Sequence, residues 1–166
     1  MMRWIRMGMG IVGGIGIFFA ATAWAEHPEK VDEAIKLIKE KTLIQSECGE
    51  GIKEYCFQIV SFDDEACEIT AKQVYSKKQF DKPRLVFIGK ARLKDLNPKF
   101  FKAEGNLIEL YTTNGEKRVL NSQNGSVEKA STLYLYTNTI DPAQTQRVAK
   151  ALGFLIELCG GQDSYF

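Results

Sequence analysis

Two helical segments enclose a long run of short alternating segments, and this order constrains the fold more than any other feature of the chain. Apolar residues recur at helical spacing in residues 28–41 and 142–159. Between residues 55 and 138, apolar and polar side chains alternate over short stretches, as half-buried strands require. The sequence therefore predicts an α+β fold with an N-terminal helix, a curved antiparallel sheet or partly open barrel of five to six strands, and a C-terminal capping helix.

Six segments have the alternation of strands, and the clearest covers residues 84–93. There, Lys90, Arg92 and Lys94 share one face, so we expect the basic side chains to gather on one surface of the sheet. The opposite, apolar face of this segment holds Leu85, Phe87, Gly89, Ala91 and Leu93. The other five predicted strands cover residues 55–62, 67–75, 106–112, 117–121 and 131–138.

Two Asn-Gly dipeptides mark turns between the predicted strands. Asn114-Gly115 predicts a hairpin between the strands on either side of it, because both residues tolerate a positive φ. Asn124-Gly125 predicts the loop that follows.

The last helix has a clear start. Asp141 can cap it, Pro142 suits the first helical position, and Gln144 completes a capping box with Asp141. Gly153, inside the helix, suggests a close approach to the sheet. The apolar stripe that should face the sheet consists of Val148, Leu152, Leu155, Ile156 and Cys159.

This pattern resembles pleckstrin-homology-like domains in its meander of strands, its turn at residues 93–96 and its closing helix. The ending of the chain, residues 149–161, is similar to that of small secreted bacterial proteins of unknown function. The first helix and the cysteines depart from the pleckstrin-homology plan, so the phosphoinositide binding of that family is not carried over to any residue. A cystatin-like fold, with a leading helix held by a curved sheet, is the alternative.

The beginning of the chain has the layout of a secretory signal peptide. Two arginines precede an uncharged run over residues 7–22, and the small residues around Ala25 fit the signal peptidase. We expect cleavage after Ala25, which divides the chain into a signal peptide, residues 1–25, and a single periplasmic or secreted domain, residues 26–166. The alternative is an uncleaved N-terminal membrane anchor, since the run approaches the ~20 residues that span a bilayer.

Charge is unevenly distributed along the expected mature chain, although it sums close to zero. The 20 Lys or Arg and 21 Asp or Glu after residue 25 argue against a nucleic-acid binder, which would carry a global positive field. Residues 26–71 hold 12 acids and 5 bases, whereas residues 72–102 hold 10 bases and 2 acids. The basic stretch predicts a patch that docks an anionic partner. Alternatively, it lies beside the acidic segment and neutralises it.

The leading functional prediction is a non-enzymatic binding module of the periplasm or cell envelope. It would recognise an envelope protein, or another anionic surface, through the basic sheet face. Two adjacent phenylalanines between lysines would extend this face as an amphipathic surface if they were exposed. The predicted binding residues are Lys90, Arg92, Lys94, Lys99, Phe100, Phe101 and Lys102.

Four cysteines in an exported domain allow three disulfide pairings, among which the sequence does not choose. We favour Cys48 with Cys56, closing a small loop, and Cys67 with Cys159, tying the last helix to the sheet. The second pair closes a loop of about 90 residues, for which the chain-entropy model gives roughly 4 to 5 kcal/mol. Because Cys67 and Cys159 lie on apolar faces and no Cys-x-x-Cys is present, the expected role is structural.

The scarcity of some side chains in the expected mature chain excludes several kinds of catalytic and metal-binding site. Its one histidine is His27, so the body of the domain has no histidine to act as a general base or metal ligand. The one acidic cluster, residues 63–65 with Glu68, lacks the spacing of a calcium loop. We therefore predict no enzyme activity, no cofactor and no metal. Two alternatives are a small-molecule or lipid carrier with a cavity between sheet and last helix and, ranked last, a hydrolase working through paired carboxylates.

Overall fold

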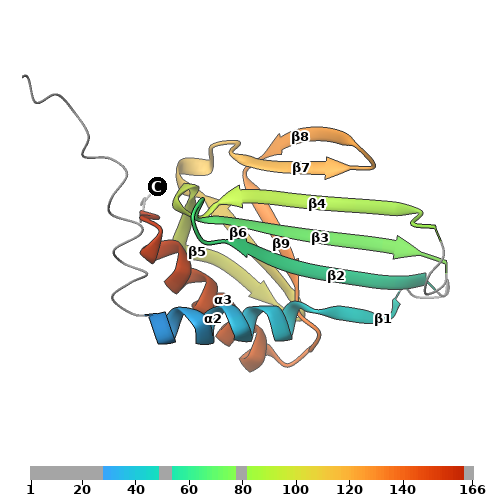
Figure 1. Cartoon of the computed structure of the whole chain (residues 1–166), viewed down its shortest axis with the longest axis horizontal. Helices are drawn as coiled ribbons and strands as arrows, with labels where there is room; N and C mark the ends of the chain where they lie inside the picture. Colours follow the sequence, from blue (N-terminus) through green and yellow to red (C-terminus); the bar gives the residue numbers. More distant parts are fainter. Residues whose placement is uncertain (1–27, 49–53, 78–81, 163–166) are drawn as a thin grey trace, which may run out of the picture.

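Helices near both ends of the chain flank antiparallel strands that do not close into a barrel, so the α+β prediction is confirmed (Figure 1). The computed structural model describes residues 28–48, 54–77 and 82–162. Within these ranges the chain forms two helices and nine strands, and the strands make two sheets. The predicted signal peptide lies outside the described residues and stays a prediction.

The larger sheet has six strands in the order β1-β2-β3-β4-β7-β8, and each neighbouring pair is antiparallel. The first four are consecutive in the chain, whereas β7 joins β4 only after the chain has formed β5 and β6 of the second sheet. The bounds are β1 (Ile44–Cys48), β2 (Glu54–Asp63), β3 (Glu68–Ser76), β4 (Leu85–Arg92), β7 (Val119–Gln123) and β8 (Ser126–Ala130).

The smaller sheet has three strands in the order β5-β6-β9. A short 3-10 turn, η1 (Leu93–Asp95), leads from β4 into β5 (Leu96–Glu104), which pairs with β6 (Leu107–Thr112). The last strand, β9 (Thr132–Tyr136), pairs with β6. The chain therefore leaves the large sheet after β4, returns to it for β7 and β8, and leaves it again for β9.

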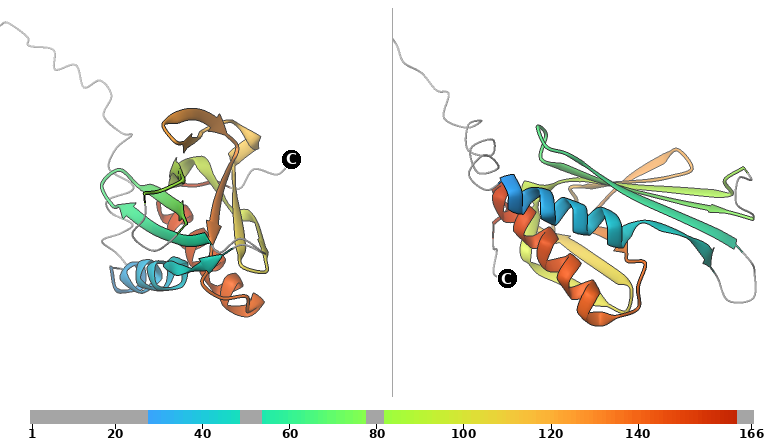
Figure 2. Two further views of the ribbon diagram at one scale, coloured as in Figure 1. Left: turned by 90° about the vertical axis from the view of Figure 1, so that its right-hand side faces the viewer. Right: turned by 60° about the horizontal axis from the view of Figure 1, so that its bottom comes forward.

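Two helices pack side by side against these sheets (Figure 2). The first, α2 (Pro28–Thr42), agrees with the predicted residues 28–41, and it contacts β2. The second, α3 (Pro142–Leu158), contacts α2 and β5, so the last helix covers the small sheet as well as its neighbouring helix. The predicted apolar stripe of α3 is confirmed, because Val148, Leu152, Leu155, Ile156 and Cys159 are all buried.

Two glycines stand where neighbouring elements come too close for a side chain. A Cβ atom at Gly153 of α3 would lie 2.7 Å from the carbonyl oxygen of Pro98 in β5, which confirms the predicted close approach. At Gly89 of β4, a Cβ atom would lie 2.6 Å from a methyl group of Leu133 in β9. Gly89 therefore marks the point where the two sheets meet.

The turn at Asn114-Gly115 forms, but the hairpin predicted there is wrong. The turn is the short 3-10 segment η2 (Thr113–Gly115), in which Asn114 has φ 58° and Gly115 has φ 66°. It links β6 of the small sheet to β7 of the large sheet, and these two strands do not pair with each other. Positive φ values set the chain reversal here, whereas the burial of each strand decides its partner.

The second Asn-Gly dipeptide makes the hairpin instead. Gln123 and Ser126 are paired across Asn124-Gly125, which is therefore a two-residue loop between β7 and β8. Its φ values, 49° and 91°, are both positive, as such a loop requires.

Side chains and a proline define the start of α3. The Asp141 carboxylate accepts a hydrogen bond from the backbone N–H of Ala143 at 2.9 Å, and Pro142 follows it. The predicted capping box with Gln144 is wrong, because the Asp141 backbone N–H donates to Thr139 Oγ1 at 3.1 Å. The local sequence thus identified Asp141 as the capping residue, but not the acceptor of the Asp141 backbone N–H.

A buried glutamine connects three elements that are distant in sequence. Gln58 of β2 is 2% exposed, and its Nε2 donates to the carbonyl oxygens of Thr42 at 2.8 Å and Tyr136 at 2.6 Å. Its Oε1 accepts from the backbone N–H of Tyr136 at 3.0 Å. These hydrogen bonds join β2 to the end of α2 and to β9, and they satisfy an amide that would be costly to bury unpaired.

Candidate binding groove

Two basic residues of β4 lie on the outward face of the large sheet, as the alternation of that strand predicts. Lys90 and Arg92 are exposed, whereas Ala91 between them is buried. On the neighbouring strand β3, Thr70 lies opposite Lys90 and Glu68 lies opposite Arg92. The polar face of β4 therefore continues onto β3.

These side chains line an open groove of about 390 Å³ on the outward face of the large sheet. Five of the eight lining residues are cationic and only one is acidic, so the groove has an excess of positive charge. We call it the cationic groove. Its lining residues are Glu68, Lys90, Ala91, Arg92, Lys117, Arg118, Leu120 and Lys129.

One buried carboxylate, that of Asp95, bonds to both arginines of the cationic groove. Asp95 is 5% exposed; its Oδ2 accepts from Arg92 Nε at 2.9 Å, and its Oδ1 accepts from Arg118 Nη1 at 2.9 Å. Arg118 also bonds to the carboxylate of Glu116, and together Asp95 and Glu116 raise its pKa. Charge-assisted bonds of this kind fix the direction of a guanidinium group. Asp95 therefore pre-orients two of the five cations.

The three lysines of the cationic groove are held less tightly. Lys90 Nζ lies 2.5 Å from Glu68 Oε1, across the β3–β4 pair. Neither Lys117 nor Lys129 forms an ion pair with another residue in the described ranges. Their charges are therefore available to an anion entering the groove.

A second open groove, of about 310 Å³, adjoins the first, because Arg118 lines both. Lys94, one of the predicted binding residues, lies here beside Asp95 and Glu116. The two acids offset the two cations, so this groove is close to neutral. Lys94 thus lies next to the cationic groove and does not line it.

The remaining predicted binding residues belong to β5 of the small sheet. Phe100 is 51% exposed, and its ring centroid lies 4.9 Å from that of Tyr111. Lys102 is exposed and pairs with Glu104 at 2.7 Å. With Tyr134 of β9, which is 46% exposed, these residues form the outward face of the small sheet, which we call the aromatic face.

Phe101 and Lys99 do not extend this surface in the predicted way. Phe101 is partly buried and packs against the hydrophobic core. Lys99 is exposed at a turn in which Asn97 Oδ1 accepts the backbone N–H groups of Lys99 at 3.0 Å and Phe100 at 3.1 Å. The structure therefore places two of the seven predicted residues on the large sheet, four on the small sheet and Lys94 in the turn η1 between them.

Hydrogen bonding shifts the ionisation of the aromatic face. The Tyr111 hydroxyl donates to the carboxylate of Glu109, and this bond, aided by partial burial, raises the pKa of Tyr111 above its usual value. The Lys102–Glu104 pair raises the pKa of Lys102 and lowers that of Glu104. Because this pair is fully exposed, its effect on stability is small.

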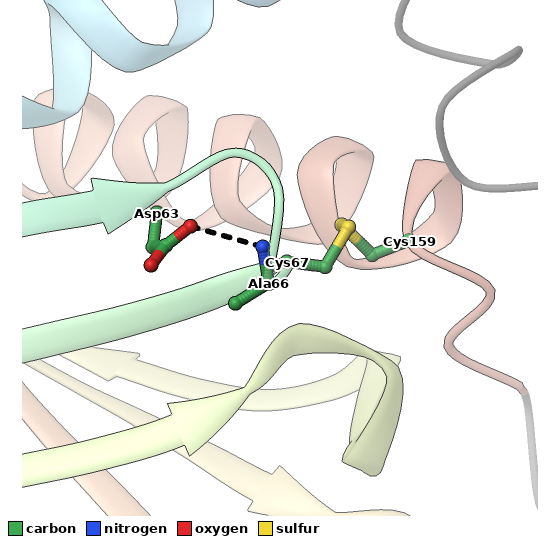
Figure 3. The surroundings of a disulfide bond; sticks show 4 residues. All are labelled: Asp63, Ala66, Cys67 and Cys159. Atoms are coloured by element: carbon green, nitrogen blue, oxygen red, sulfur yellow. Dashed lines mark hydrogen bonds between the residues drawn. A yellow bond between two sulfur atoms is a disulfide. The ribbon is translucent and has the colours of Figure 1, made fainter. Parts of the chain in front are cut away.

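The disulfide between Cys67 and Cys159 joins the turn between β2 and β3 to the end of α3 (Figure 3). Their Cα atoms are 5.9 Å apart and 92 residues separate them in sequence, which confirms the predicted pairing of this couple. Each cysteine is adjacent in sequence to a lining residue, Glu68 in the cationic groove and Gly160 in the second groove. For the other predicted pair, Cys48 with Cys56, the side chain of Cys48 lies outside the described residues.

The acidic cluster forms a turn between β2 and β3. The Asp63 carboxylate accepts the backbone N–H of Ala66 at 2.9 Å, as Figure 3 shows, and Cys67 closes the turn with φ 49°. Glu68 points instead toward Lys90. Across the described ranges, no group of three or more metal-binding side chains comes together.

Apolar side chains of the sheets and of α3 pack together into one core. Leu93, Leu96, Ile108, Leu135 and Leu152 are each at most 1% exposed and belong to one core. This packing offers no support for the carrier alternative at that position.

Three residues of the cationic groove were not among the predicted binding residues: Lys117, Arg118 and Lys129. They lie outside the basic stretch of residues 72–102, and β7 and β8 bring them beside β4. The Lys117-Arg118 pair, just after the Asn114-Gly115 turn, was a signal in the sequence. Its use required knowing that β7 pairs with β4.

Comparison with family models, with curated proteins and with solved structures finds no match to this chain. None of the helices in the described part of the chain is both long and apolar enough to cross a membrane. The function must therefore be inferred from the groove and its surroundings.

Proposed function

We propose that this protein is a non-enzymatic, secreted or periplasmic module that binds an acidic protein partner in the cationic groove. The observation that carries the proposal is the lining of the groove, with five cations and one carboxylate around about 390 Å³. Like-signed charge gathered in a concave site attracts and orients an oppositely charged partner.

The organisation of the arginines supports binding rather than simple solvation. Arg92 and Arg118 share the buried carboxylate of Asp95, at 2.9 Å each. Such pre-orientation reduces the side-chain entropy that binding would otherwise cost. Surface lysines without such partners would lose more freedom on binding. The groove therefore combines two arginines oriented by Asp95, one lysine paired with Glu68, and two lysines without an ion pair in the described ranges.

A protein partner is favoured because exposed apolar side chains accompany the charge. Leu120 lines the cationic groove and is 40% exposed, and Val127, on the neighbouring strand β8, is 65% exposed. Protein interfaces combine apolar contacts with a charged rim, whereas a small inorganic anion has no use for the apolar part. The near-neutral charge of the mature chain disfavours a nucleic acid.

The disulfide supports the proposed location. Structural disulfides persist in oxidising compartments, and Cys67–Cys159 is consistent with the export that the N-terminal sequence predicts.

The test compares the affinity of the wild type for its partner with that of a variant in which the charge of the groove is reversed. Cross-linking the wild type in envelope extract recovers its acidic protein partner, and polyglutamate serves as a defined probe. A Lys90→Glu/Arg92→Glu/Lys129→Glu variant should bind both at least tenfold more weakly than the wild type does. The matched control, Lys36→Glu/Lys39→Glu/Lys150→Glu, makes the same charge change on exposed helix residues and should bind as the wild type does. Equal binding by both variants would exclude the cationic groove as the site.

A further inference from the structure

We propose that the partner binds as an added β-strand along β8, with its acidic side chains over the cationic groove. This inference rests on the proposed function and names the form of the partner: an extended acidic segment. It is carried by the position of β8 at an edge of the large sheet, next to the groove.

The open side of β8 is accessible. β8 pairs with β7 and with no other strand among the described residues, and its first four residues are exposed. An edge strand presents unpaired backbone N–H and C=O groups that can accept a further strand. This is the surface that β-strand addition uses in peptide recognition.

The register identifies which backbone groups face the open edge. The two-residue loop makes Gln123 and Ser126 a hydrogen-bonded pair, and such pairs alternate along an antiparallel ladder. Glu128 and Ala130 therefore bond to β7, whereas the N–H and C=O groups of Val127 and Lys129 point away from it. These two residues would bond to an added strand.

The same two residues place their side chains on the groove side of the sheet. Lys129 lines the cationic groove, and Val127, two residues away, shares its face. Cross-strand neighbours interact most strongly, so an acidic residue is favoured opposite Lys129 and an apolar residue opposite Val127. The fitting segment therefore alternates acidic and apolar side chains on one face.

Charge complementarity selects this occupant over a second copy of the chain. If β8 paired with β8 of another copy, the two cationic grooves would lie on one continuous sheet and repel each other. An acidic segment instead neutralises the lysines that have no ion pair within the described ranges, Lys117 and Lys129.

The test uses the full chain and a defined peptide of about nine residues, a length typical of a strand. In this peptide, glutamate and valine alternate on one face and threonine occupies the other. Binding is measured by fluorescence anisotropy. Val127→Pro removes an N–H that points to the open edge, so the sheet should tolerate it. Val127→Thr is the matched control, because it keeps the backbone N–H.

The wild type and Val127→Thr should bind the peptide equally, and Val127→Pro should bind it about tenfold more weakly, as expected for the loss of one or two main-chain hydrogen bonds. The same peptide, N-methylated at the residues facing β8, should bind as weakly to the wild type. This second measurement leaves the protein unchanged, so it decides the question even if Val127→Pro fails to fold.

The outcomes separate this inference from the proposed function. If the N-methylated peptide binds fully while the charge-reversed groove does not bind, strand addition is overturned and the groove proposal stands. If neither change matters, both fail. If a phosphatidylglycerol vesicle or a single-stranded oligonucleotide binds more tightly than the peptide, or if β8 mediates self-association, an acidic protein segment is not the occupant.

Discussion

The outward faces of the two sheets differ in chemistry, although the inward faces of both sheets contribute to one apolar core. On the large sheet, the cationic groove gathers five positive side chains around one acidic one. On the small sheet, the aromatic face carries Phe100, Tyr111 and Tyr134, with its lysine paired to a glutamate. The first surface has an excess of positive charge, whereas the second carries one lysine and two glutamates.

This difference shows that strand alternation alone does not define a binding surface. Lys90 and Lys102 both lie on outward strand faces within one basic stretch of the sequence, yet they belong to different sheets. The close approach at Gly89 brings the inward faces of β4 and β9 together, so the outward faces point away from each other. The passage of the chain from β4 to β5 through η1 separates Lys90 from Lys102, and the return from β6 to β7 adds further cations beside Lys90.

Removing the disulfide should have the largest effect, and it should perturb the cationic groove more than the aromatic face. The double variant Cys67→Ser/Cys159→Ser should lose roughly 4 kcal/mol in the free energy of unfolding, because it releases a 92-residue loop in the unfolded chain. Urea denaturation measures this loss. Unchanged stability would show that the loop is not restrained by this bond in solution.

Filling the space at Gly153 should destabilise the core that both faces share. A Gly153→Val side chain would meet the Pro98 carbonyl oxygen, and overpacking of this kind costs about 3 kcal/mol. The control Lys150→Val places the same side chain on an exposed position of α3 and should cost much less. Thermal unfolding compares the two variants, and equal melting temperatures would contradict the close approach of α3 to β5.

Replacing Asp95 should affect the cationic groove and the second groove beside it but not the aromatic face. Asp95→Asn removes the charge that holds Arg92 and Arg118, and we expect a loss of about 1 to 2 kcal/mol in stability, since the arginines are half exposed. Asp64→Asn, in the exposed turn between β2 and β3, is the control and should be neutral. Line broadening of the arginine Nε signals in NMR should accompany the first change and not the second.

The smallest effect should be a change in titration confined to the aromatic face. Glu109→Gln removes the carboxylate that accepts the Tyr111 hydroxyl, so the pKa of Tyr111 should fall toward its usual value. Since the folded pKa is raised, this bond stabilises the protein below the unfolded pKa of about 10 and loses that effect as pH rises through the folded value.

Ultraviolet titration of phenolate detects this shift, and Tyr111→Phe identifies the signal. Tyr134→Phe serves as the control, because Tyr134 is the smallest cause of the raised pKa and its loss should leave most of the increase in place. Binding at the cationic groove should not respond to Glu109→Gln; a clear response would show that the two faces are coupled.

Local patterns in the sequence predicted much of the fold. Apolar spacing gave both helices and the buried stripe of α3, and alternation gave the outward direction of Lys90 and Arg92, because side-chain direction follows from helix and strand geometry. Strands β1, β5 and β8 were missed. They are short or bent, as at the register shift between Leu96 and Phe101, so they lack a clean alternation.

By itself, the sequence determined both helices, six of the nine strands in the described residues, and the positions where the chain can turn. Only the tertiary structure decided that the strand after Asn114-Gly115 crosses to the large sheet, which places Lys117, Arg118 and Lys129 beside Lys90 and divides Phe100 and Lys102 from them. The physical reason is that turn propensity depends on a few neighbouring residues, whereas strand partners are chosen by burial of whole faces across the core.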